Sequence, residues 1–127
     1  MNPLHWHPEH TPAMRVEAVY GDRAVRCFIE RPESMHSLLE RAVAVHGDSD
    51  AVVCGALHWS YRELDAEVAR IAAGLAAQGV GAGERVALFM GNRPAFIAVL
   101  FALQRLGAIA VPIGEREQKP GLAYMLA

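Results

Sequence analysis

The sequence predicts an α/β fold, in which a partial, mostly parallel sheet is flanked by helices and preceded by short β-hairpins. Three observations predict it. An amphipathic helix pattern covers residues 60–78, and an apolar, strand-like run follows at 85–90. A nearly continuous apolar helix pattern over 93–106 then leads to a second apolar run at 108–113. This strand–helix–strand succession predicts a βαβ unit, which we expect to be a right-handed crossover.

The composition is that of an ordinary soluble domain. The chain has 127 residues, 53% hydrophobic and 20% charged, enough for a real core but few for a two-substrate enzyme. Its formal net charge of −2, with Lys119 as the only lysine, provides no basic surface for nucleic acid or an anionic membrane. No apolar stretch is long enough to span a bilayer, and no secretory signal is recognisable. We therefore expect a cytoplasmic protein with two reduced thiols, Cys27 and Cys54.

Residues 1–13 are expected to form a flexible leader, and residues 14–127 one incomplete domain. The leader carries His5, His7 and His10. A Pro-rich tail without a carboxylate or cysteine partner is a poor metal site, so we predict no metal ligand there.

Two short hairpins are predicted before the βαβ unit. Alternating segments on both sides of Gly21-Asp22 are typical of a hairpin with a primed turn. A second hairpin is expected over residues 51–59, around Gly55-Ala56.

A helix is predicted between the two hairpins, beginning at Ser34 and ending near Gly47. His36 and His46 lie on or near it, and we interpret both as surface residues rather than ligands. The apolar residues that share one side of this helix are Met35, Leu38, Leu39, Ala42 and Val45.

The helix over 60–78 has the clearest start, because Ser60 and Glu63 form a capping box. Gly79 is expected to end it. The glycine-rich segment that follows, Gly79–Arg85, runs from a helix into a strand, which is the reverse of a dinucleotide-binding loop. We interpret it as a helix stop and a turn. The apolar side of the helix carries Tyr61, Leu64, Val68, Ile71, Ala72 and Leu75, and the opposite side Arg62, Asp65, Glu67 and Arg70.

Within the βαβ unit, residues 85–90 are expected to form a parallel strand buried on both faces. Asn92 is predicted to be the N-cap of the next helix, with Pro94 in its first turn. That helix, from Arg93 to about Leu106, is apolar on almost every side and should be largely covered. Pro120 begins a last helix of about two turns.

The position of a ligand site can be predicted from the fold class, since open α/β sheets bind ligands outside the carboxyl ends of their strands. This rule points to Gly91-Asn92-Arg93 and to Ile113-Gly114-Glu115-Arg116. The plainer interpretation, which we favour, makes Asn92 a helix cap and leaves Arg93 solvated. No nucleophilic triad, Walker loop or shielded carboxylate pair is recognisable. We therefore assign no catalytic, cofactor-binding or metal-binding residue.

Two sequence motifs of this chain resemble, in the same order, the first two core motifs of the adenylate-forming enzymes. This family includes acyl-CoA synthetases and the adenylation domains of peptide synthetases. Residues 59–64, WSYREL, resemble the first core motif, and residues 103–113, LQRLGAIAVPI, resemble the second. The resemblance covers about residues 34–127. The connecting segments that are similar to the family's are Gly47-Asp48, Gly79-Val80, Gly83–Val86, Asn92–Phe96 and Leu122–Leu126.

The resemblance implies the front portion of an ATP-dependent, AMP-forming carboxylate–CoA ligase. Such an enzyme couples a carboxylic acid to AMP, releases pyrophosphate and then transfers the acyl group to a thiol such as coenzyme A. ATP, Mg and coenzyme A are implied for the full-length enzyme, whose phosphate loop and catalytic lysine lie downstream of the matching region. We therefore expect the 127-residue chain to bind no cofactor and to be inactive alone, with the remainder of its own domain as a partner.

One departure from the motifs favours an acyl-CoA synthetase, and hence fatty acid metabolism. Gly114 stands where amino-acid adenylation domains usually have Asp, and Ile109-Ala110 replace their aromatic-bearing stretch. The alternatives are an amino-acid adenylation domain and, from another class, a non-catalytic α/β interaction module or truncated remnant. In a truncated domain we expect Phe89, Phe101 and Leu103 to be exposed.

Overall fold

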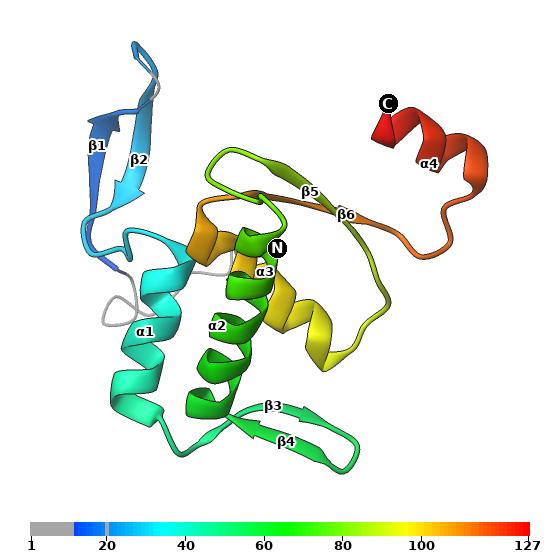
Figure 1. Ribbon diagram of the computed structural model, residues 1–127. Coiled ribbons are helices and arrows are strands. Elements are labelled where there is room, and N and C mark those ends of the chain that lie inside the picture. Colours follow the sequence, from blue (N-terminus) through cyan, green and yellow to red (C-terminus); the bar gives the residue numbers. More distant parts are fainter. Residues whose placement is uncertain (1–11, 20) are drawn as a thin grey trace, which may run out of the picture. The chain divides into compact units, whose positions relative to one another are not determined.

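The computed structural model describes residues 12–19 and 21–127, so the three leader histidines lie outside the described part. The chain divides into two compact units, Met1–Pro32 and Glu33–Ala127 (Figure 1). The first unit contains a hairpin, and the second contains all the helices of the described residues. Each unit is described by itself.

The first unit is an antiparallel hairpin of β1 (Met14–Ala18) and β2 (Ala24–Phe28), as predicted. The expected two-residue primed turn is wrong. Ala18 pairs with Ala24, and the Val19 N–H donates to the Arg23 carbonyl at 3.0 Å, so the connection is longer. The register places Met14 opposite Phe28 at the far end of the hairpin.

A charged cluster lies on the same hairpin. Arg31 Nη2 is 2.7 Å from Glu17 Oε2, and the Arg15 guanidinium contacts the other carboxylate oxygen. The hydrogen bonds from Arg31 and then Arg15 lower the pKa of Glu17 to about 2.

The second unit begins with α1 (Met35–His46), which starts and ends as predicted. Ser34 is its N-cap, and Ser37 completes a capping box. The helix contributes the buried Leu39 to the core. His36, expected at the surface, is instead largely covered, with its side chain 19% exposed and its Nε2 3.5 Å from a Glu40 oxygen. His36 lies in the first turn of α1 and Glu40 lies one turn later on the same side of the helix, so the two side chains meet.

The second predicted hairpin forms from β3 (Asp50–Cys54) and β4 (Leu57–Ser60). Cys54 pairs with Leu57, so the turn consists of Gly55-Ala56, and Gly55 has a φ of +61°. The prediction is confirmed.

The longest helix, α2 (Tyr61–Ala77), has the predicted capping box. The Glu63 N–H donates to Ser60 Oγ at 3.2 Å, and the Ser60 N–H donates to Glu63 Oε2 at 2.8 Å. At the other end, Gly79 has a φ of +88°, and two backbone bonds close a Schellman motif. The glycine-rich segment is therefore a helix stop and a turn, as expected.

The βαβ unit consists of β5 (Arg85–Phe89), α3 (Pro94–Leu106) and β6 (Ile109–Ile113). The two strands are parallel, in a register that runs from Arg85–Ile109 to Phe89–Ile113. The α/β class with small sheets and flanking helices is confirmed. In the described residues β5 and β6 form a two-stranded parallel sheet, and each hairpin forms a separate two-stranded sheet.

The core of the second unit comprises two apolar clusters that share the helix α3. The first joins α1, α2, α3 and β3, and the second joins α3 to the parallel strands. Leu103 is fully buried, so the expected exposure of this residue is wrong, because it lies on the side of α3 that faces the strands. Phe101 is half-buried in the first cluster. The buried members are Leu39, Val52, Leu64, Val68, Ala72, Ala98 and Ala102 in the first cluster and Leu88, Leu103 and Ala108 in the second.

The expectation that β5 is buried on both faces is also wrong. Leu88 is 3% exposed, whereas Phe89, whose exposure was expected, is 48% exposed. Successive side chains of a strand point to opposite faces, and α3 covers only one of them.

The last helix, α4 (Lys119–Leu126), begins one residue before the predicted start at Pro120, which lies in its first turn. None of its residues is buried, and none belongs to either apolar cluster. Figure 1 shows it apart from the remainder of the second unit, at the end of β6.

Candidate functional site

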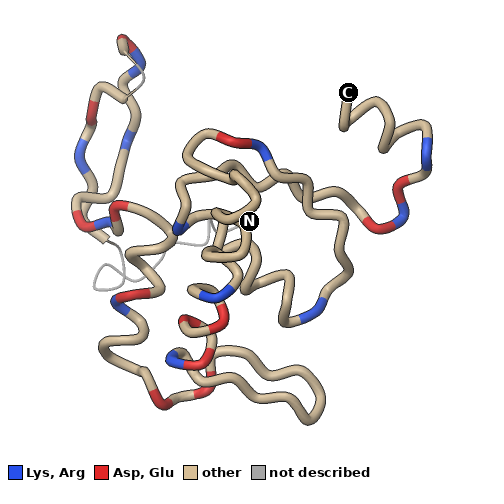
Figure 2. Tube along the Cα trace, in the orientation of Figure 1, with Lys and Arg blue, Asp and Glu red and all other residues tan. Residues whose placement is uncertain are grey.

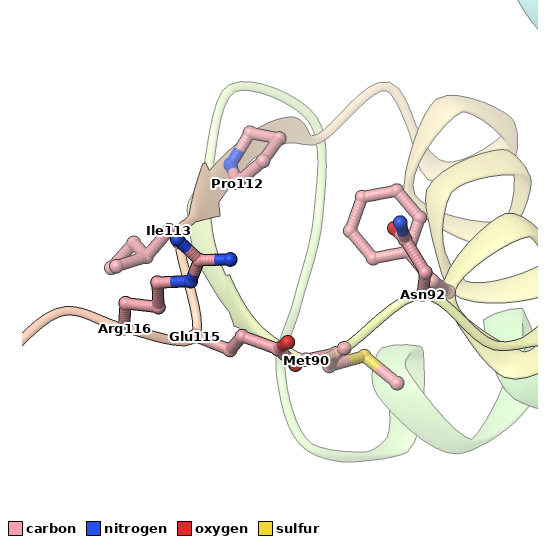
Figure 3. A pocket seen from close by; sticks show the side chains of 9 residues that line it. Met90, Asn92, Pro112, Ile113, Glu115 and Arg116 are labelled. Atoms are coloured by element: carbon pink, nitrogen blue, oxygen red, sulfur yellow. The ribbon is translucent and has the colours of Figure 1, made fainter.

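A cavity of about 380 Å³ lies at the carboxyl ends of β5 and β6, where the fold class predicts a ligand site. Parallel pairing of Phe89 with Ile113 places the segments that follow the two strands side by side. The sequence-predicted segments therefore meet. The residues that line the cavity are Met90, Gly91, Asn92, Phe96, Pro112, Ile113, Gly114, Glu115 and Arg116 (Figure 3).

The charged side chains of the cavity come from the segment after β6. A Cβ added at Gly91 would collide with the Glu115 carboxylate, so this acid lies directly over the end of β5. Figure 3 shows the Glu115 side chain directed toward Met90, with Asn92 on the opposite side of the hollow from Arg116. The cavity thus combines one carboxylate, one guanidinium and one amide.

The predicted role of Asn92 as a helix cap is wrong. The N-cap of α3 is Arg93, with φ −149° and ψ 160°, and no side chain caps the helix. The residue before a proline is held in the extended region, so Pro94 forces Arg93 into the N-cap position. Asn92 consequently lies one residue outside the helix, where its amide lines the cavity. Arg93 is exposed, as expected, and lines an adjacent cavity instead.

Three lining residues were missed by the sequence analysis: Met90, Phe96 and Pro112. Phe96 could have been found, because the first turn of a helix that follows a strand lies next to the end of that strand. Met90 is the last residue of the apolar run assigned to the strand, but β5 ends one residue earlier.

Two further hollows adjoin this region of the second unit. One, of about 250 Å³, contains Arg93 and the exposed thiol of Cys54, and it shares Asn92 and Phe96 with the first. The other, of about 370 Å³, is lined by apolar side chains of α1, β3 and α3, together with Tyr61 and Leu64 of α2.

The lining of the first cavity contains no serine, cysteine, threonine, lysine or histidine, and its acidic side chain is that of Glu115. Over residues 12–19 and 21–127, no group of three His, Cys, Asp or Glu side chains is arranged to hold a metal ion. Glu63 and Glu67, whose pKa values are lowered by Ser60 and Arg70, lie on α2 and do not line the cavity.

The described surface carries both signs of charge in alternation. Figure 2 shows basic and acidic residues interspersed along the trace, and several form exposed ion pairs such as Arg70–Glu67 and Arg62–Asp48. In the part of the chain that the structure describes, no helix has the length and apolar character needed to cross a membrane.

Comparison with known proteins identifies similar sequences and folds. Residues 39–127 match the family model described as AMP-binding enzyme. The 2,3-dihydroxybenzoate-AMP ligase of Bacillus subtilis (strain 168) is 44% identical over 79 residues, which are 62% of this chain and 15% of the ligase. A feruloyl-CoA synthase of Amycolatopsis sp is 38% identical over 97 residues, which are 76% of this chain and 20% of the synthase.

Among solved structures, the fold is similar to that of NpsA-ThdA, an artificially fused adenylation–PCP di-domain NRPS from Klebsiella oxytoca. The TM-score is 0.73 at 20% sequence identity, covering 77% of this chain and 19% of that one. At this identity the likeness concerns the fold. The chain thus spans 15 to 20% of the length of these proteins.

Proposed function

The chain belongs to the AMP-binding enzyme family, and on that premise we propose that it is the front portion of an ATP-dependent, AMP-forming carboxylate–CoA ligase. The observation that carries the proposal is the family match over residues 39–127, which includes both core motifs recognised in the sequence. The names of the two relatives describe the two halves of this reaction, since one is an aryl-AMP ligase and the other an acyl-CoA synthase.

The residues of the two core motifs have a structural role in the proposed enzyme. Tyr61 and Leu64 of the first motif pack in the core around α2. Gly107 of the second motif ends α3 with a φ of +70°, a conformation that glycine adopts without strain. Tyr61 and Leu64 thus hold α2 in the core, and Gly107 ends the helix of the βαβ unit. We assign no catalytic role to any of them.

ATP, Mg and coenzyme A belong to the proposed full-length enzyme. In the described part of the chain no group of three His, Cys, Asp or Glu side chains is placed to hold a metal ion, and we assign no magnesium ligand. The cavity at the strand ends has only one cationic side chain, Arg116, beside the Glu115 carboxylate. We therefore derive no step of the reaction through a residue of this chain.

The direct test is to express the complete open reading frame that encodes these residues and to assay it with ATP, Mg²⁺ and coenzyme A. Hydroxybenzoates, ferulate, fatty acids and amino acids would be supplied separately. The proposal predicts carboxylate-dependent pyrophosphate release and a coenzyme A thioester, detected by mass spectrometry, with an aryl or fatty acid.

Two results would contradict the proposal. Adenylation of amino acids without thioester formation would identify an amino-acid adenylation domain. Failure of the complete product to release pyrophosphate with any of these acids would favour a non-catalytic module. The Bacillus aryl-AMP ligase, assayed with 2,3-dihydroxybenzoate, is the positive control for the first half-reaction.

A further inference from the structure

The parallel pair β5–β6 has one face covered by α3 and one face that is largely uncovered. Val86, Leu88 and Ala110 pack with α3 in the second apolar cluster. Because side chains alternate along a strand, the opposite face carries Arg85, Ala87, Phe89, Ile109, Val111 and Ile113. Ile113 is only 6% exposed, so we call the apolar remainder, Ala87, Phe89, Ile109 and Val111, the open face. Phe89 is 48% exposed and Ile109 is 44% exposed. Parallel sheets almost always have both faces covered.

The helix α4 has the complementary property. Leu122, Met125 and Leu126 are spaced at i, i+3 and i+4 and form an apolar stripe along one side. Met125 is 45% exposed and Leu126 is 64% exposed. Tyr124, which is 87% exposed, lies on the opposite side of the helix. An apolar helix stripe and an apolar sheet face therefore lie on consecutive elements of one chain, and both are unpaired in the described residues.

We propose that α4 docks its apolar stripe on the open face of β5–β6 and thereby forms the second layer of the sheet. Figure 1 shows α4 apart from the β5–β6 pair. The docked arrangement buries Phe89 and Ile109 against Leu122 and Met125. It is independent of the proposed reaction, because it requires only the residues of this chain.

The connection between β6 and α4 is suited to this movement. It consists of residues 114–118, and strand-to-helix connections in α/β proteins are usually about 2 to 6 residues long. Gly114 is its first residue, and a Cβ there would meet nothing within 4 Å, although the Gly114 carbonyl accepts a hydrogen bond from the Glu117 N–H at 2.9 Å. The eight residues of α4 extend about 12 Å, close to the roughly 17 Å of a five-residue strand.

Docking would also act on the cavity at the strand ends. Gly114, Glu115 and Arg116 belong both to the cavity wall and to the connection that must turn. Movement of α4 therefore changes the positions of the only two charged side chains that line this cavity. The docked helix would hold Gly114, Glu115 and Arg116 of the cavity wall in one arrangement.

The first experiment compares two substitutions on opposite sides of α4 in the whole chain. Met125→Asp places a charge on the stripe, and docking predicts a fall in Tm of roughly 5 °C. Tyr124→Asp is the matched control on the outer side, and its Tm should stay within about 1 °C of the unchanged protein. Equal Tm values for the two variants would overturn the proposal.

A double-mutant cycle and a cross-link identify what the stripe contacts. Phe89→Asp should lower Tm by itself, and Phe89→Asp combined with Met125→Asp should lower it by less than the sum. In a chain with Cys27→Ser and Cys54→Ser, a short bifunctional maleimide should join Ala87→Cys to Met125→Cys within one molecule. The control pair, Val53→Cys with Met125→Cys, should not be joined, because Val53 is exposed on another sheet.

Three outcomes would contradict the assignment of α4 to the open face. Additive effects in the cycle would show that the two residues do not meet. Equal cross-linking of the control pair would show that α4 contacts no particular face. Cross-links that form only between molecules, with a dimer in sedimentation, would show that a second copy covers the open face.

Discussion

The helix α2 begins as the sequence predicts and α4 begins within one residue of its predicted start, but only α2 is built into a core. α2 has a side-chain cap at its start, a Schellman motif at its end and three buried residues. α4 has no side-chain cap bond and no buried residue. The contrast teaches that start signals and apolar spacing determine where a helix forms, whereas its packing depends on which other elements are present. The following predictions test that contrast, from the largest expected effect to the smallest.

Loss of a core side chain should separate the two helices most clearly. Leu64 of α2 is 3% exposed, so Leu64→Ala leaves a cavity and should lower the free energy of unfolding by about 3 kcal/mol. Tyr124→Ala in α4 should change it by less than about 0.5 kcal/mol, because the side chain is 87% exposed. Urea unfolding followed by circular dichroism measures both. A similar loss in the two variants would mean that α4 is packed in a way that buries Tyr124.

Substitution by alanine should change the stability of the protein in opposite directions at Gly74, inside α2, and at Gly79, at its end. Gly79 has a φ of +88°, so Gly79→Ala should destabilise the protein by about 1 to 2 kcal/mol. Gly74 lies inside the helix with nothing within 4 Å of an added Cβ, and Gly74→Ala should stabilise it by about 0.5 to 1 kcal/mol. Thermal unfolding of the pair checks this. A Gly79→Ala variant as stable as the unchanged protein would contradict the left-handed backbone conformation of Gly79.

The cap of α2 can be removed and the missing cap of α4 supplied. Ser60→Ala deletes the acceptor for the Glu63 N–H and should lower the free energy of unfolding by about 1 kcal/mol. Gln118→Ala should have almost no effect, since Gln118 makes no side-chain cap bond. Gln118→Ser should raise the helix content of α4 slightly, as detected by amide hydrogen exchange at residues 119–122. Equal losses for Ser60→Ala and Gln118→Ala would contradict the assignment of the caps.

A pH titration should show the smallest difference. The hydrogen bonds from Ser60 lower the pKa of Glu63 below its ordinary value of 4.5 in the folded chain. A carboxyl whose pKa is lower in the folded state contributes stability above its unfolded pKa and loses it as pH falls through the folded pKa. Tm should therefore decrease more steeply below pH 4.5 in the unchanged protein than in Glu63→Gln. Parallel curves for the two proteins would exclude this contribution.

Local signals predicted most of the elements. The capping box at Ser60, the turn at Gly55-Ala56 and the end of α3 at Gly107 depend on neighbouring residues only, and all three are found. The position of the cavity was also predictable, because it follows from the parallel pairing of two apolar runs.

The errors concern properties that neighbouring residues do not determine. Asn92 is a good cap residue, but Pro94 restricts the residue before it and displaces the cap to Arg93. The burial of Leu103 and the exposure of Phe89 depend on which face of a strand or helix has another layer beside it. The connection of the first hairpin is longer than the two residues Gly21-Asp22, because Ala18 pairs with Ala24.

Assay of the purified 127-residue chain for carboxylate-dependent exchange of pyrophosphate into ATP tests the central claim most directly. We predict that the chain folds cooperatively and catalyses no exchange above a control without protein, because these residues supply a scaffold and no catalytic group. The Bacillus aryl-AMP ligase, under the same conditions with 2,3-dihydroxybenzoate, should exchange. Exchange by the 127-residue chain that depends on added carboxylate would contradict this account and would place a complete active site within it.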